Sequence, residues 1–330
     1  MTENYKTILS FRRRFVKDYN LPINVVDSPY FEYYMETYDW FPKKEYNELI
    51  NDINKRFDGN INKWLEEYGE IRDKIITTIE NSEAYQEFNL MDMKIWDIPK
   101  ELKNYPDINI YNQSSIGNTF ISFDLKKANF QALKYVNPEI IFENDTYEEM
   151  IDDFVGYGSE YLKTSKYTRQ VIFGKLNPKR TITIEKYVMS KVYEVIKPYF
   201  RENEVEFIAF KADELIFKVK DFNYSGKDID IFFKAIKEKV LEKVGVEIHT
   251  EIFKIGRIVC ENHNNITVDC YIKQNLINGE EKLKSASQIF YPQLYSYWRD
   301  KEITENDLVF LAEGQLAKFM YPLQLIKIEK

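Results

Sequence analysis

Residues 207–219 read FIAFKADELIFKV, in which two apolar runs flank a short polar turn that carries Asp213 and Glu214. Aromatic and branched residues on both sides of such a turn are typical of paired β-strands. The pattern therefore predicts a hairpin with strands at residues 205–210 and 215–219.

A second apolar run, ISFDLKK, occupies residues 121–127 and contains Asp124 near its end. It predicts a buried strand over residues 119–125. Apolar residues recur at helical spacing within residues 182–199 and 228–244, which predicts a helix in each. The order strand, helix, hairpin, helix, strand predicts an antiparallel sheet with helices on one face, which is an α+β fold.

The chain of 330 residues divides into three predicted regions. Residues 1–106 are polar and aromatic, and their periodic apolar positions predict a mostly helical N-terminal region. Residues 107–245 contain the predicted sheet and its helices. Residues 246–330 predict a C-terminal α/β extension that begins with two strands.

The composition predicts a folded cytoplasmic protein, because 44% of the residues are hydrophobic and only two are cysteines. No apolar run approaches the roughly 20 residues that a membrane-spanning helix needs, and the N-terminus does not resemble a signal peptide. We therefore expect no membrane association. The abundance of Tyr, Phe, Lys, Asn and Ile suggests an AT-rich genome, such as that of a bacterium, a phage or another virus.

Charge is segregated along the chain, although the net charge of −8 by itself argues against nucleic-acid binding. Residues 161–192 contain eight basic residues and one acidic residue, whereas residues 143–160 contain seven acidic residues and no basic one. An exposed, solvated helix would also explain the basic segment. Its position between the two acidic motifs favours a role facing an anion.

The two acidic motifs predict a site for two divalent cations. Phosphoryl transfer by two metal ions requires carboxylates from different chain segments, which hold ions about 3.5–4 Å apart. Asp124 and Asp213 are the predicted ligands, with Glu214 assisting or orienting them. Oxygen ligands suit Mg²⁺ or Mn²⁺.

The basic segment predicts the contacts with a nucleotide. Lys163, Lys166 and Arg169 are spaced so that one helix would present them on one face, toward a triphosphate. Phe173 follows on that face and would stack on the incoming base, with space left by Gly174. The remaining predicted nucleotide-binding residues are Lys175, Asn129 and Gln131.

Three segments carry a resemblance to known polymerases. Residues 210–219 resemble motif C of family A DNA polymerases, in which His-Asp-Glu precedes a similar apolar strand. Phe123-Asp124, with Gln131 seven residues after the aspartate, resembles motif A of the single-subunit phage RNA polymerases. Arg169 followed by Phe173-Gly174 resembles part of motif B of family A.

The resemblance covers roughly residues 119–255 and implies a polymerase palm with a basic, fingers-like segment. It also implies metal ligation by Asp124 and Asp213 and triphosphate contact by Arg169. Three places depart from family A, which has Tyr-Gly at Asn177-Pro178, Glu at Asn129 and His at Ala212. The short interval between Arg169 and Asp213 is more similar to that of reverse transcriptases and viral RNA-dependent polymerases.

The resulting hypothesis is a nucleotidyltransferase that extends a 3′-hydroxyl with nucleoside triphosphates, in the manner of a DNA or RNA polymerase. Its partners would be a nucleic-acid primer and template, and other proteins of a replication or transcription complex. The alternative is a catalytically degenerate palm protein that binds nucleic acid or acts as a scaffold in such a complex. A structural protein unrelated to polymerases is the third reading.

A weaker pattern concerns zinc, because every Cys and His of the chain falls within residues 249–270. The spacing from Cys260 to His263 is that of zinc ligands, and His249 and Cys270 would complete a set of four. Against this, both cysteines also fit ordinary apolar strand positions.

Overall fold

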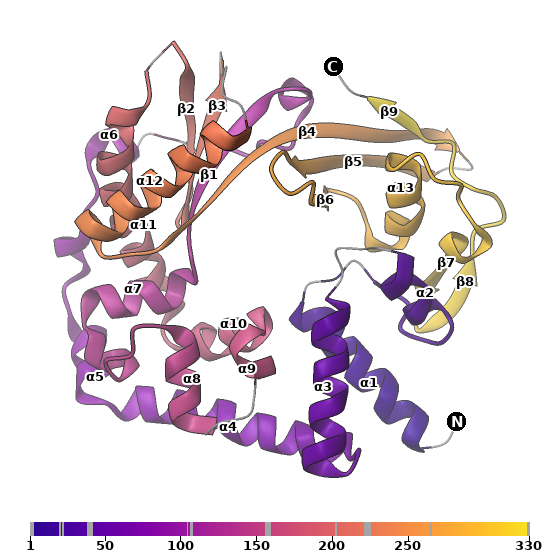
Figure 1. Cartoon of the computed structure of the whole chain (residues 1–330), viewed down its shortest axis with the longest axis horizontal. Coiled ribbons are helices and arrows are strands. Elements are labelled where there is room, and N and C mark those ends of the chain that lie inside the picture. Colours follow the sequence, from indigo (N-terminus) through magenta and orange to yellow (C-terminus); the bar gives the residue numbers. More distant parts are fainter. Residues whose placement is uncertain are drawn as a thin grey trace.

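The computed structural model describes residues 3–19, 21, 23–37, 42–103, 105, 108–155, 160–201, 203–220, 226–263 and 266–328. Within these residues the chain has a mixed α+β fold, in which helices surround an antiparallel sheet (Figure 1). The predicted α+β class is therefore confirmed. No described helix is long and apolar enough to cross a lipid bilayer.

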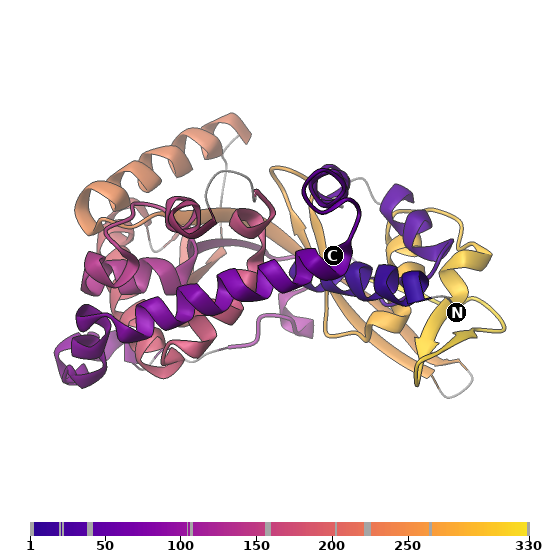
Figure 2. The same cartoon turned by 90° about the horizontal axis from the view of Figure 1, so that it is seen from below.

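The described part of the N-terminal region consists mostly of helices. Its helices are α1 (Glu3–Asp18), α2 (Tyr30–Thr37), α3 (Lys43–Phe57), α4 (Ile61–Asn81), α5 (Glu83–Leu90) and α6 (Lys100–Lys103), with short 3₁₀ turns at Met93–Trp96 and Gln113–Ser115. Helix α3 ends where Asp58 adopts a left-handed conformation, and the Asn60 side chain then caps α4 by accepting a hydrogen bond from the Lys63 amide. Helix α4 runs along one side of the molecule and connects α3 with α5 (Figures 1 and 2).

The main sheet is antiparallel in every described pairing and has the strand order β2-β3-β1-β4-β5-β6, with β9 also paired to β4. Its strands are β1 (Thr119–Leu125), β2 (Val205–Phe210), β3 (Glu214–Val219), β4 (Ile248–His263), β5 (Ile266–Asn275), β6 (Glu281–Lys284) and β9 (Ile326–Ile328). A separate ribbon consists of β7 (Val309–Ala312) and β8 (Gln315–Lys318).

Helices connect the strands. Between β1 and β2 lie α7 (Ala128–Val136), α8 (Tyr147–Val155), α9 (Glu160–Thr164), α10 (Lys166–Lys175) and α11 (Pro178–Ile196), with 3₁₀ turns at Pro138–Ile141 and Lys197–Tyr199. Helix α12 (Gly226–Val244) connects β3 with β4. Leaving out the shorter helices, the connectivity is β1, α11, β2, β3, α12, β4, a β-α-β-β-α-β arrangement.

Strand β1 is central and is buried on both faces. Ile121 and Phe123 belong to the large core that also contains residues of α11 and α12. The opposite face carries Phe120, which stacks on Phe253 of β4, and is covered by residues 110–116. Because side chains of a strand alternate between faces, Asp124 shares the face of Phe120 and Ser122.

The C-terminal region is continuous with this sheet. Strand β4 pairs with β1 over seven residues, from Thr119↔Lys254 to Leu125↔Ile248. The predicted boundary between residues 245 and 246 therefore divides one sheet. Beyond it lie helix α13 (Tyr291–Trp298) and the 3₁₀ turns at Gln288–Phe290 and Glu305–Leu308.

The two ends of the described chain pack together. The Tyr33 hydroxyl of α2 lies 3.0 Å from the Thr304 hydroxyl, and the Tyr34 hydroxyl donates to the Asn306 carbonyl at 3.1 Å. In Figure 1, α2 accordingly lies beside the β7–β8 ribbon, on the side of the molecule away from β1 to β3.

Candidate carboxylate site

Two acidic side chains lie directly across from one another on the central strands of the sheet. Asp124 on β1 pairs with Glu214 on β3, and the Leu125 amide donates to the Asp213 carbonyl at 2.8 Å. In this register Asp124 and Glu214 form a non-hydrogen-bonded pair, whose Cβ atoms lie about 4.5–5.5 Å apart. The predicted motifs therefore meet at one end of two adjacent strands.

The charges of this cluster interact strongly. Burial, together with repulsion from the carboxylates of Asp213 and Glu214, raises the pKa of Asp124 to about 7. The Glu214 carboxylate has a partial partner in Lys211, whose Nζ lies 3.3 Å away. Negative charge is thus concentrated where β1 ends and β3 begins.

A fourth carboxylate, Glu185 of α11, belongs to the same cluster, and the sequence did not predict it. Its side chain is buried, and burial followed by repulsion from Asp213 and Asp124 raises its pKa to about 7. Asn129 of α7 donates a hydrogen bond from Nδ2 to the Glu185 carboxylate at 2.8 Å. The sequence did hold one indication of this residue, because Glu185 is the single acidic residue in the basic segment 161–192 and lies on the apolar face of its helix.

Strand β4 supplies the next polar groups on this face of the sheet. His249 pairs with Asp124 in the register, and Glu251 pairs with Ser122. Burial alone would raise the pKa of Glu251, but the hydrogen bond from His249 and the charge of Lys273 hold that pKa well below its ordinary value. Glu251 is therefore an ionised partner of Lys273.

The negative charge of the clustered carboxylates would favour the binding of a divalent cation. The charge of Asp213 raises the pKa of both Asp124 and Glu185, and a cation placed among these carboxylates would relieve the repulsion. Among the described residues, however, no group of three or more His, Cys, Asp or Glu side chains is arranged to hold a metal ion by itself. Mg²⁺ is commonly held by one or two carboxylates together with water and substrate phosphates.

The first part of the basic segment forms two helices, α9 and α10, where the sequence predicted one. Ser165 interrupts it and caps α10, where its Oγ accepts a hydrogen bond from the Thr168 amide at 3.1 Å. Lys163 therefore lies on α9, where it pairs with Asp152 at 2.7 Å and Glu160 at 3.1 Å. The predicted common face of Lys163 with Lys166 and Arg169 is wrong.

The side chains of α10 have different environments. Lys166 is exposed, and the half-buried Arg169 guanidinium lies over the Tyr147 ring at 5.7 Å. Phe173 is 1% exposed and packs in the core against Phe130 and Tyr147. The prediction that Phe173 stacks on a base is therefore wrong for this conformation. The last two predicted residues of this helix, Gly174 and Lys175, are exposed at its C-terminal end.

The two polar residues predicted after Asp124 support other elements. Asn129 holds Glu185, as described above. Gln131 bridges α7 to the start of β4, because its Nε2 donates to the Glu247 carbonyl at 2.7 Å and its Oε1 accepts from the Glu247 amide at 2.6 Å. In this structure both side chains therefore form hydrogen bonds with other residues of the protein, Glu185 and Glu247.

The predicted zinc set is not a site. His249 and Cys260 are 11 residues apart on β4, a separation of about 35 Å along an extended strand. Cys260 and Cys270 are free thiols buried in the core. The side chain of His263 lies outside the described residues. The two cysteines are core residues, in agreement with the alternative that they occupy apolar strand positions.

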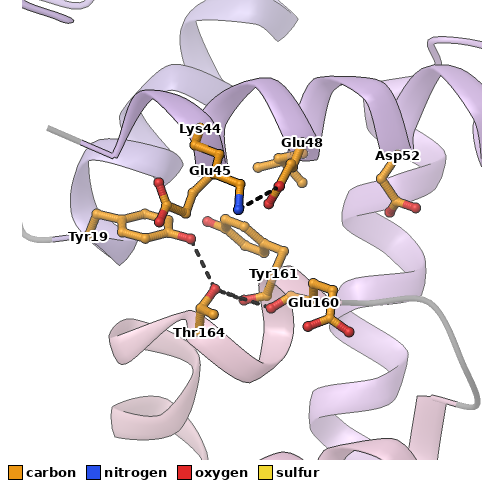
Figure 3. Close-up of a pocket in the computed structure, with 9 residues that line it drawn as sticks. Tyr19, Lys44, Glu45, Glu48, Asp52, Glu160, Tyr161 and Thr164 are labelled. Atoms are coloured by element: carbon orange, nitrogen blue, oxygen red, sulfur yellow. Dashed lines mark hydrogen bonds and ion pairs between the residues drawn. The ribbon is translucent and has the colours of Figure 1, made fainter.

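A hollow of about 460 Å³ lies away from the carboxylates, between α3 and α9 (Figure 3). Its walls hold several acidic side chains, and the Tyr19 hydroxyl lies 3.0 Å from the Thr164 hydroxyl across it. The lining residues are Tyr19, Lys44, Glu45, Glu48, Leu49, Asp52, Glu160, Tyr161 and Thr164. None of these is a residue that the sequence predicted for the site.

Comparison with known proteins gives no match: no protein-family model fits this sequence, and no curated protein is significantly similar to it.

Proposed function

We propose that this protein is a nucleotidyltransferase of the polymerase-palm type, which joins nucleoside triphosphates to the 3′-hydroxyl of a nucleic acid. The observation that carries the proposal is the pairing of Asp124 with the Asp213-Glu214 turn at the ends of β1 and β3. The β-α-β-β-α-β connectivity supports it, because it brings a carboxylate after the first strand beside a carboxylate in the hairpin.

In this proposal Asp124 and Asp213 hold the divalent cations. Bound Mg²⁺ or Mn²⁺ supplies Lewis-acid stabilisation of the phosphoryl oxygens and activation of the attacking hydroxyl. Glu185, held by Asn129, adds negative charge beside the two aspartates and so strengthens the attraction of the site for a cation. Glu214 and its partner Lys211 border the site on the β3 side.

The reaction forms one bond and breaks one. The 3′-oxygen attacks the α-phosphorus and loses its proton to solvent, while the bond between the α-phosphorus and the bridging oxygen breaks to release pyrophosphate. Positive charge is needed where the pyrophosphate leaves. In the proposal, Lys166 and Arg169 of α10 supply that charge.

A second candidate function is a degenerate palm that binds nucleic acid without catalysis, within a replication or transcription complex. The observation that favours it is the lack, in the described part of the chain, of a self-sufficient group of three metal-binding side chains. Asn177-Pro178 also replaces the Tyr-Gly of family A. This candidate predicts no Mg²⁺-dependent binding of nucleotides.

Primer extension tests the proposal. The purified chain is incubated with Mg²⁺ or Mn²⁺, all eight nucleotides and primed DNA and RNA templates, beside Asp124→Asn and Asp213→Asn. We expect each variant to reduce incorporation at least about 100-fold, the loss typical of removing one group that stabilises transition-state charge.

The matched control is Glu238→Gln, which removes an exposed carboxylate from α12. It should incorporate nucleotides at the wild-type rate. Equal incorporation by wild type and both aspartate variants would contradict the proposal. Absence of incorporation by the wild type, together with retained nucleic-acid binding, would favour the degenerate palm.

A further inference from the structure

A second hollow, of about 420 Å³, lies between the N-terminal helices, α10 and the β6–α13 region. Three of its lining residues are lysines: Lys166 from α10, and Lys282 and Lys284 from β6. The other lining residues are Tyr19, Leu21, Pro42, Glu45, Glu280, Leu283, Gln288, Tyr291 and Tyr295. This hollow thus brings together basic residues that are far apart in the sequence.

The register of the sheet accounts for the lysines of β6. Lys282 pairs with Lys273 of β5, and Lys284 pairs with Tyr271, so these side chains share one face. The pairings of β4 with β1 and β5 place Asp124, Glu251 and Lys273 on that face too. The lysines therefore lie on the same face of the sheet as Asp124.

The lysines differ in their partners. Glu251 forms an ion pair with Lys273, and Lys282 lies 3.2 Å from Glu280 and 4.0 Å from Glu251. Among the described residues, neither Lys166 nor Lys284 has a carboxylate within ion-pair distance. Lys284 instead lies over the Tyr111 ring, with Nζ 5.6 Å from its centroid.

Lys166 and Lys284 are close enough to repel. Burial lowers the pKa of Lys284, and the charges of Lys273, Lys282 and Lys166 lower it further, against the attraction of Glu214. Both lysines line one hollow and, within the described part of the chain, neither forms an ion pair, so an anion bound between them would relieve their repulsion, although two glutamates also line the hollow.

We propose that Lys166 and Lys284 bind one phosphate group between them, and so connect α10 to the C-terminal part of the sheet. The phosphate belongs to a nucleic-acid strand or to a nucleoside triphosphate, which share this chemistry. The choice of these two sources rests on the proposed function. The geometry of the lysines does not depend on catalysis.

Binding measurements on the full chain in EDTA test the site, because no metal-dependent reaction occurs there. One arm measures the anisotropy of a fluorescent single-stranded 20-nucleotide DNA over a range of salt concentrations. The other arm measures binding of a fluorescent nucleoside triphosphate. The variants are Lys166→Gln, Lys284→Gln and the double variant.

We expect each single variant to weaken binding about tenfold in the arm that uses the site, the usual effect of losing a hydrogen bond to a charged group. If that arm is the DNA, the plot of log K against log salt becomes shallower by about 0.7, which corresponds to one phosphate contact. Because both lysines contact one phosphate, the double variant should lose little more than either single variant.

Lys234→Gln combined with Lys243→Gln is the matched control, since both lysines are exposed on α12. It should bind as the wild type does. Lys284→Arg keeps the charge and should retain binding, which separates loss of the phosphate contact from loss of the fold. Thermal unfolding of each variant provides the same check.

Unchanged binding in both arms would overturn the proposal, and so would additive losses in the double variant, which would mean two separate phosphates. An effect confined to one arm identifies the source of the phosphate. A chain that fails in primer extension but shows the non-additive loss here would refute the proposed activity and retain this site.

Discussion

Gly256→Ala should destabilise the protein at the contact between β4 and α13. A Cβ atom added to Gly256 would lie 2.3 Å from Cη2 of Trp298 and 3.0 Å from its Cζ3. Real Cβ atoms do not approach other heavy atoms so closely, so either the strand or the indole ring has to move.

The indole ring has little freedom to move. Trp298 is 5% exposed, and its Nε1 donates to the Glu281 carboxylate at 2.8 Å. The same carboxylate accepts a hydrogen bond from Arg299 at 2.7 Å, and Lys327 lies over the ring at 4.5 Å. A shift of the ring would disturb all of these contacts.

We expect a loss of about 2–3 kcal/mol in the free energy of unfolding, the upper part of the range for overpacked cores. For a chain of this size, the melting temperature should fall by about 3–4 °C. Urea unfolding monitored by tryptophan fluorescence measures the free energy, and thermal unfolding gives the temperature.

Gly69→Ala is the matched control. Gly69 lies within α4, and a Cβ added there would meet no atom within 4 Å. It should stabilise the protein by about 0.5–1 kcal/mol, because alanine favours the helix more than glycine does. If Gly256→Ala were as stable as the wild type, the packing of α13 against β4 described above would be wrong.

Three further predictions concern other parts of the molecule. Ser165→Ala removes the cap of α10 and should cost about 1 kcal/mol in urea unfolding; an unchanged midpoint would contradict the break between α9 and α10. Burial raises the pKa of Cys270 from 9.0 to about 12, so its thiol ionises first in the unfolded state and the stability it provides falls as pH rises above 9. The wild type should therefore lose about 1.4 kcal/mol more than Cys270→Ala between pH 8 and pH 10, and equal losses would place Cys270 in water. Under the proposed function, Glu185→Gln should raise the Mn²⁺ concentration needed for half-maximal incorporation about tenfold, a usual effect of a group that supports metal ligands; an unchanged requirement would leave Glu185 outside the site.

The sequence was sufficient for the strands that carry the carboxylates. Residues 119–125, 205–210 and 215–219 form strands within one residue of prediction, because each is a short apolar run bounded by polar turns. The sequence predicted that Asp124 and Asp213 act together, and the register places Asp124 opposite the neighbouring Glu214. The joining of β4 to the sheet across the predicted region boundary depends on its pairing with β1, which lies far away in the sequence.

Other features depended on burial, which spacing alone does not give. Phe173 has the helical spacing of a residue facing the same way as Arg169, but α10 turns that position into the core against Tyr147. Glu185 sits on a buried helix face where a carboxylate is unexpected. Its proximity to Asp124 and Asp213 follows only from the packing of α11 against the sheet. Cys260 and His249 are only 11 residues apart in the sequence, but an extended strand separates them by much more than the size of a metal site.

The central claim is that Asp124 and Asp213 bind the same divalent cations. Electron paramagnetic resonance of Mn²⁺, titrated into the protein with a nucleoside triphosphate, measures this directly. We predict that the wild type and Glu238→Gln bind Mn²⁺ equally and that Asp124→Asn and Asp213→Asn each bind it at least about tenfold more weakly. Equal Mn²⁺ binding by the wild type and both aspartate variants would contradict the claim.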